Sequence, residues 1–196
     1  MPDRFYARSS NGRTEAFEAF NLGSNPGRAS KLILMTLENK TQHCLFCQKH
    51  FRSEQLFSNQ YFFAVADGSP VNPGHLLIIP YRHVEDYFSL NREEAASLYD
   101  MLNQGKTHCR DEQIRQGYLR TLANQQGRGK SKQFASLAIE NWDKKITGYN
   151  IGINNGLSAG QTIFHLHIHL IPRFNGDVAD PTGGVRFVIP QRANYR

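Results

Sequence analysis

The sequence predicts an α+β fold built on an antiparallel β-sheet, and three stretches of the chain indicate it. In residues 164–171, histidines alternate with apolar residues, which in a strand places the histidines on one face and the apolar side chains on the other. Residues 61–66 and 75–79 are rich in aromatic and branched residues and flank a turn-rich segment, which predicts a hairpin. Asn91, followed by Glu94, predicts the capped start of a helix.

The other elements follow from the same local criteria. The helical pattern that begins after Asn91 continues to about Gln126, and Gly105 is the position where we consider a break. After Pro172 the chain is rich in Gly and Pro, which predicts an extended tail. The remaining expected elements are a short helix at 14–20, an apolar strand or helix at 31–37, a short helix at 134–142 and a strand at 149–154.

Composition limits the class of protein. A chain of 196 residues makes one domain with extensions, and its net charge of +6 suits a polyanionic small substrate, a nucleic-acid contact or no particular partner. No apolar run resembles a signal peptide or approaches the length of a membrane span. We therefore expect a cytoplasmic protein with no membrane partner.

The histidine row at 165, 167 and 169 allows four interpretations. Neutral imidazoles can bind a metal, act as nucleophiles toward phosphorus, or bind phosphates. The fourth interpretation is an ordinary polar strand face. Regular alternation in a chain with 8 histidines favours one of the chemical roles.

Several blocks of the sequence, in the same order, resemble the histidine triad (HIT) family of nucleotide hydrolases and transferases. The triad itself carries the resemblance, together with Asn72–Val84, Tyr149–Gly156 and the Ala159–Thr162 segment before it. Ile171–Arg173, followed by Asp177, resembles the bacterial dinucleoside polyphosphate hydrolase branch. The resemblance implies a HIT-like α+β fold, an antiparallel sheet with helices packed on one face.

The resemblance also divides the chain into parts. Residues 1–40 become an N-terminal extension, residues 41–178 a HIT domain, and residues 179–196 an extended C-terminal tail. The segment around 103–145 is longer than the family leads us to expect. We interpret it as a helical insertion and assign it no function.

Catalytic and nucleotide-binding roles are implied by family position. The middle histidine, His167, would be the nucleophile, and His169 would lie by the phosphate or leaving-group oxygens. Gln161, which would also serve catalysis, Thr162 and Asn154 match positions that hold the phosphates. Asp67 matches a ribose-binding position, although a turn aspartate is an equally good interpretation.

Cys44 and Cys47 form a Cys-x-x-Cys pair that can hold one tetrahedral ion with two further ligands. Relatives with this pair complete a structural zinc site with two histidines, whose matching positions are His83 and His165. His43 and His50 are rival ligands by proximity, and two reduced core cysteines are the alternative.

The resemblance implies an enzyme that hydrolyses dinucleoside polyphosphates such as diadenosine tetraphosphate. The alternatives are a phosphorylase or nucleotidylyltransferase of the same superfamily, and a zinc-held nucleotide-binding protein with little turnover. The uridylyltransferase branch has glutamine in place of the third histidine, so His169 favours hydrolysis. We also expect a homodimer and no stable nucleic-acid partner.

Overall fold

The computed structural model describes residues 6–8, 14–16, 41–124 and 129–193. The chain divides into two compact units, Met1–Lys40 and Thr41–Arg196. In the first unit, β1 (Tyr6–Arg8) pairs antiparallel with β2 (Thr14–Ala16). The predicted helix at 14–20 is therefore wrong for its first three residues, and the rest of it lies outside the described residues, as does the 31–37 element.

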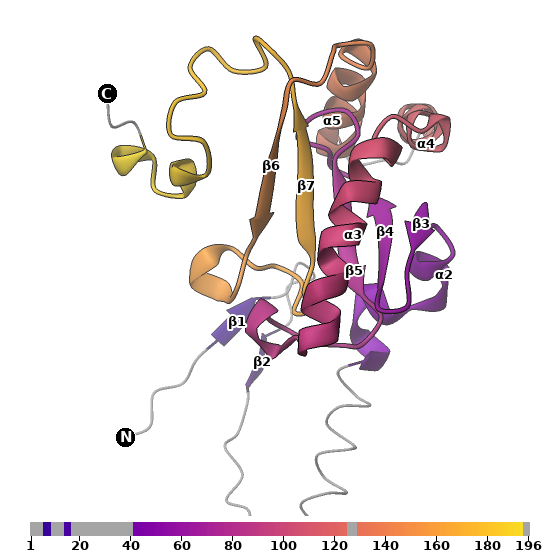
Figure 1. Cartoon of the computed structure of the whole chain (residues 1–196), viewed down its shortest axis with the longest axis vertical. Helices are drawn as coiled ribbons and strands as arrows, with labels where there is room; N and C mark the ends of the chain where they lie inside the picture. The colour runs from indigo at the N-terminus through magenta and orange to yellow at the C-terminus, as the bar shows by residue number, and fades with distance from the viewer. Residues whose placement is uncertain (1–5, 9–13, 17–40, 125–128, 194–196) are drawn as a thin grey trace, which may run out of the picture. The chain divides into compact units, whose positions relative to one another are not determined.

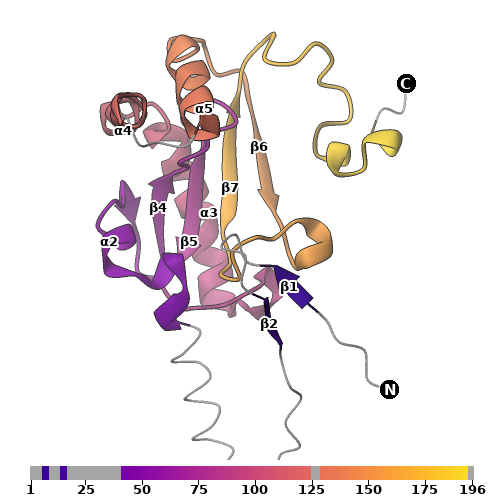
Figure 2. The same cartoon turned by 180° about the vertical axis from the view of Figure 1, so that it is seen from behind.

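The second unit contains the predicted antiparallel sheet, in the strand order β3-β4-β5-β7-β6 (Figures 1 and 2). β4 and β5 form the expected hairpin, and β7, which carries the last triad histidine, lies between β5 and β6. The α+β prediction is confirmed. The strands are β3 (Phe57–Ser58), β4 (Phe62–Ala66), β5 (Leu76–Pro80), β6 (Gly148–Ile153) and β7 (Ile168–Arg173).

Helix α3 (Arg92–His108) covers one face of the sheet across β4 and β5 (Figure 1). Its start is the predicted capping box, with reciprocal bonds between Asn91 and Glu94. It continues through Gly105, where a side chain would press on Leu170 of β7, so the glycine permits close packing rather than a break. The helix ends instead at the Cys109 cap.

The segment predicted as an insertion contributes two further helices, α4 (Glu112–Ala123) and α5 (Gly129–Glu140). They pack against each other and share a core with Leu76 and Leu170 of the sheet. Tyr118 of α4 is buried, and its hydroxyl accepts a hydrogen bond from the Gly74 amide at 3.3 Å. The insertion therefore supports the loop that leads into β5.

The opposite face of the sheet is covered by the segment that contains the cysteine pair. A short 3-10 helix (Leu45–Cys47) is followed by α2 (Lys49–Arg52). Phe46 is 1% exposed and packs with side chains of β4 and β5. The cysteines are thereby anchored above the face on which the histidines lie.

The triad strand is shorter than predicted, because β7 begins at Ile168 rather than Phe164. The ladder pairs Ile78 with Ile168, so its continuation would set Pro80 opposite Leu166. Proline has no amide hydrogen to donate, which ends the ladder there. Leu166 donates instead to Val84 at 2.6 Å. The face alternation still holds: Leu166 and Ile168 lie in the α3 core, and the histidines lie opposite.

The end of β7 is fixed by a side-chain clamp. Arg173 donates two hydrogen bonds to Asp177, at 2.6 and 2.8 Å, and Asn72 donates a third at 2.7 Å. This arrangement ties β7 to the loop before His75. Beyond it, the tail contains two short 3-10 helices, Gly184–Val188 and Pro190–Arg192, where the sequence predicts an extended chain.

Candidate functional site

Cys44, Cys47, His83 and His165 converge on one point, and one donor atom from each lies within 4.8 Å of all the others. Nδ1 of His165 is 3.4 Å from Sγ of Cys44 and 3.5 Å from Sγ of Cys47. Nδ1 of His83 is 3.4 Å from Sγ of Cys47. The rival histidines, 43 and 50, are exposed and do not belong to this cluster.

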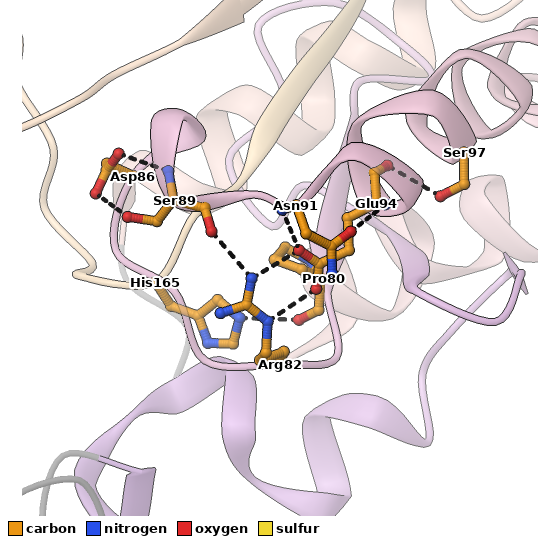
Figure 3. Close-up of polar contacts among 8 residues, drawn as sticks. All are labelled: Pro80, Arg82, Asp86, Ser89, Asn91, Glu94, Ser97 and His165. Carbon is orange, nitrogen blue, oxygen red and sulfur yellow. Dashed lines mark hydrogen bonds and ion pairs between the residues drawn. The ribbon is translucent and has the colours of Figure 1, made fainter.

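The orientation of His165 is fixed by a backbone contact of the ring nitrogen that faces away from the cysteines. Its Nε2 lies 2.9 Å from the carbonyl oxygen of Pro80, the residue that ends the ladder (Figure 3). A carbonyl oxygen only accepts, so Nε2 carries the proton and Nδ1 presents its lone pair to the thiols. Burial lowers the pKa of His165 to about 4, which keeps the ring neutral, as a metal ligand requires.

The turn that carries His83 is held by an ion pair between the half-exposed Arg82 and the buried Glu94 (Figure 3). Arg82 donates to both carboxylate oxygens of Glu94, at 2.8 and 2.6 Å. Glu94 is 4% exposed and also accepts from the Asn91 amide at 2.9 Å. The Glu94 carboxylate therefore completes the cap of α3 and also orients the turn beside the cluster of possible metal ligands.

Two thiols and two imidazoles suit a tetrahedral zinc ion, whose ligand atoms stand about 3.3–3.8 Å apart. The three shortest sulfur–nitrogen distances in the cluster, 3.4, 3.4 and 3.5 Å, fall in this range, and all the donor atoms lie within 4.8 Å of one another. Without a cation, burial and the Cys44 sulfur raise the pKa of Cys47 to about 11. A metal would hold both sulfurs as thiolates, and four protein ligands would leave no open position for substrate.

One ring nitrogen of His167 bonds to the backbone, which leaves the other able to bind a ligand or to act as a nucleophile. Its Nδ1 lies 2.8 Å from the carbonyl oxygen of His165, so Nδ1 donates and Nε2 keeps a free lone pair. The ring is 7% exposed and meets the edge of Phe46, with centroids 5.3 Å apart. His167 is therefore largely buried, and only a small part of its imidazole reaches the surface.

His169 belongs to a chain of polar contacts that begins in the hairpin loop. The Val71 amide donates to Nδ1 of His75 at 3.2 Å, which leaves the proton of His75 on Nε2. Nε2 of His75 then donates to Nδ1 of His169 at 3.0 Å. His169 must carry its own proton on Nε2, the nitrogen that remains available to a ligand.

Asp67 approaches this chain from the end of β4, with its carboxylate 3.4 Å from Nδ1 of His75. Burial lowers the pKa of His75 to about 4 and also lowers the pKa of His169, so both rings are neutral at pH 7. Asp67 also accepts from the Ser69 amide at 2.8 Å, as a turn aspartate does. The Ser69 contact agrees with the turn interpretation of Asp67, and ribose binding stays a prediction.

The side chain of Gln161 bonds to the backbone around it. It is 3% exposed, and its amide nitrogen donates to the carbonyl oxygens of Glu85, at 2.7 Å, and Ile163, at 3.2 Å. Its carbonyl oxygen accepts from the Gly156 amide at 2.7 Å. The side chain therefore shapes the loop before the triad. Thr162 is exposed beside it, and Asn154 follows the end of β6.

The contacts of His75 and Glu94 were not predicted as parts of the site. His75 was predicted only as the first residue of a strand, and Glu94 only as part of a helix cap. Nothing in the local sequence indicates that His75 meets His169 94 positions later or that Glu94 meets Arg82. For the contact between Glu94 and Arg82, the Asn-x-x-Glu spacing at the helix start was the only signal in the sequence.

A family model described as the HIT domain matches residues 48–176, which span the triad, His83 and Asp67. The chain belongs to the HIT family. Cys44 and Cys47 lie just before the matched segment, so the possible metal cluster joins the HIT domain to the residues that precede it.

Relatives of this HIT protein differ in length and description. AP-4-A phosphorylase of Mycobacterium tuberculosis is 32% identical over 132 residues, which cover 66% of this chain and 51% of that protein. Protein hit of Bacillus subtilis is 26% identical over 136 residues, covering 68% and 72%. A zinc-bound histidine triad family protein from Mycobacterium smegmatis, known as a crystal structure, is 26% identical with a TM-score of 0.45, covering 71% and 81%. The chain thus spans about half the length of the phosphorylase.

Proposed function

We propose that this protein hydrolyses dinucleoside polyphosphates, such as diadenosine tetraphosphate, at the α-phosphate through a nucleotidyl-histidine intermediate on His167. The observation that carries the proposal is the bond from Nδ1 of His167 to the carbonyl oxygen of His165. In the neutral ring this bond keeps the proton on Nδ1, so that Nε2 has the lone pair that a nucleophile needs.

The reaction follows in two displacements. Nε2 of His167 bonds to the α-phosphorus as the bond to the bridging oxygen breaks, and the leaving oxygen keeps that electron pair. Nε2–H of His169 stabilises the leaving oxygen by hydrogen bonding, which its contact with His75 favours. Water then attacks phosphorus, the electron pair of the phosphorus–nitrogen bond returns to Nε2, and the proton of the water passes to solvent.

The other members of the site have supporting roles in this proposal. Asp67 binds the ribose hydroxyls, and Asn154 and Thr162 contact the phosphates. Gln161, whose amide bonds to the loop backbone, shapes the phosphate-binding loop and contacts phosphate only if those bonds are exchanged on binding. The net charge of +6 favours association with a polyanionic substrate.

The four-residue cluster is proposed to hold a structural zinc. The donor set and its spacing support this assignment, and the ion would tie the cysteine segment to the strand that carries His167. Among the described residues, no helix is both long enough and apolar enough to cross a membrane. A homodimer and a cytoplasmic location stay predictions.

A second reaction deserves direct comparison, because one relative is an AP-4-A phosphorylase. In phosphorolysis, inorganic phosphate replaces water in the second displacement. The test is product identification on a panel of dinucleoside polyphosphates, with and without added phosphate. Hydrolysis of diadenosine tetraphosphate gives AMP and ATP in both cases, whereas phosphorolysis requires phosphate and gives ADP and ATP. Tight nucleotide binding with no product under either condition would identify a binding protein instead.

A further inference from the structure

A cavity of about 460 Å³ lies where β4 ends, and α4 forms one of its walls. From the sheet it is lined by Val65 and Asp67. From α4 it is lined by Gln113, Gly117 and Thr121, which are spaced four residues apart and so share one face of the helix. The predicted insertion therefore lines the same cavity as Asp67, the residue that approaches the histidines.

This wall is rigidly placed. Ile114 and Tyr118, on the adjoining face of α4, are 1% and 4% exposed in the core shared with the sheet. Tyr118 also accepts the hydrogen bond from the Gly74 amide, next to His75. The helix that shapes the cavity is thus connected to the loop that delivers His75 to the site.

The middle of the wall is a glycine with no packing role. A glycine inside a helix costs about 1 kcal/mol relative to alanine. A side chain at Gly117 would meet only the end of Arg120, at 3.8 Å, so no backbone approach explains the residue. The glycine leaves this part of the cavity wall without a side chain, and the end of Arg120, which also lines the cavity, lies beside it.

The cavity is joined to the reactive histidines through one side chain. Asp67 lines the cavity, and its carboxylate is 3.4 Å from His75, which donates to His169. Asp67 therefore has the cavity on one side and the histidines on the other.

We propose that α4 is the base-recognition wall of this enzyme, with the base lying over Gly117 and the amide of Gln113 recognising adenine. A glutamine amide matches adenine, because it can accept from the exocyclic amine and donate to a ring nitrogen. The inference deepens the proposed function and rests on it for the identity of the ligand as a nucleotide.

The test is equilibrium binding of AMP, GMP and CMP to the full chain, compared with the Gln113→Ala and Gln116→Ala variants. Gln116 is an exposed glutamine on the same helix that bonds to Glu112 and does not line the cavity. We expect Gln113→Ala to weaken AMP binding about tenfold and to remove the preference for AMP over GMP. Gln116→Ala should bind as the wild type does.

A second variant tests the space rather than the amide. Gly117→Leu should preserve the helix, which circular dichroism would verify, and should abolish AMP binding by filling the cavity. Equal binding by the wild type and Gln113→Ala, or undiminished binding by folded Gly117→Leu, would overturn the assignment of α4. So would the absence of saturable AMP binding. Because AMP is not cleaved, these results are independent of whether the protein hydrolyses any dinucleotide.

Discussion

The carbonyl oxygen of Pro80 accepts a hydrogen bond from Nε2 of His165 at 2.9 Å. Through its other ring nitrogen, His165 faces the cysteines, and through its own carbonyl oxygen it fixes Nδ1 of His167. One residue therefore connects the end of β5, the possible metal cluster and the proposed nucleophile. Disturbing the cluster should consequently affect the reactive histidine as well as stability.

We expect the purified chain to contain about one zinc ion, and Cys47→Ser to lose it. Cys47 lies near both cluster histidines, and ligation energy is coupled to folding. Chelation of the wild type and the Cys47→Ser substitution should both lower the melting temperature. Elemental analysis and thermal denaturation are the measurements.

Cys109→Ser is the matched control for that experiment. Cys109 is buried at the end of α3 and does not belong to the cluster, so its variant should retain the metal. Wild-type protein prepared without chelators that contains no stoichiometric metal would contradict the assignment. Full metal content in Cys47→Ser would contradict it equally.

Glu94→Gln should reduce the free energy of unfolding by about 1–3 kcal/mol, because the amide is uncharged and its nitrogen cannot accept the hydrogen bond that one carboxylate oxygen receives from Nε of Arg82. Arg82 is half-exposed, which keeps the loss below that of a fully buried pair. Urea unfolding measures the difference. Glu93→Gln, at the exposed neighbouring position, should change stability by less than about 0.5 kcal/mol. If the two substitutions lowered stability equally, the structural role assigned to Glu94 would be contradicted.

Stability should fall as the pH decreases from about 6.5 toward 4, in part because of His75. Its folded-state pKa is lowered to about 4 by burial, from an ordinary value of 6.5. The unfolded chain therefore binds a proton that the folded chain excludes, so this contribution is complete above pH 6.5 and is lost as acid is added.

His75→Gln isolates this effect, because a glutamine can still accept from Val71 and donate to His169. Denaturation across this pH range should show a shallower acid slope in the variant, by up to about 1.4 kcal/mol per pH unit. His50→Gln replaces an exposed histidine and should leave the slope unchanged. If His75→Gln has the wild-type slope, His75 is not the titrating group.

The sequence predicted those features that depend on local pattern. The hairpin strands, the capping box at Asn91 and the alternation of the triad histidines needed only neighbouring residues. The metal ligands came from resemblance, and the structure brings all four together. The early end of the triad ladder depends on Pro80, which lies 85 positions before His165, and no local pattern of the triad contains that information.

The insertion shows the same limit. Its helical character could be predicted from the spacing of apolar residues. The interruption between the helices, however, comes after His108 rather than at Gly105. The packing of Gly105 on Leu170 reverses the usual helix-breaking expectation for glycine. The bond between Tyr118 and Gly74 is equally nonlocal, so the position of α4 beside Asp67 could not be predicted from the sequence.

The most direct test of the nucleophile is to trap it. Wild type and His167→Ala are mixed with a diadenosine polyphosphate labelled at the α-phosphate, quenched in alkali, and examined for label on the protein. A phosphorus–nitrogen bond to histidine survives alkali and breaks in acid. We expect wild type to carry alkali-stable, acid-labile label at His167, and His167→Ala to carry none and to lose turnover while still binding substrate. Near-normal turnover by His167→Ala, or label on another residue, would contradict the proposed mechanism.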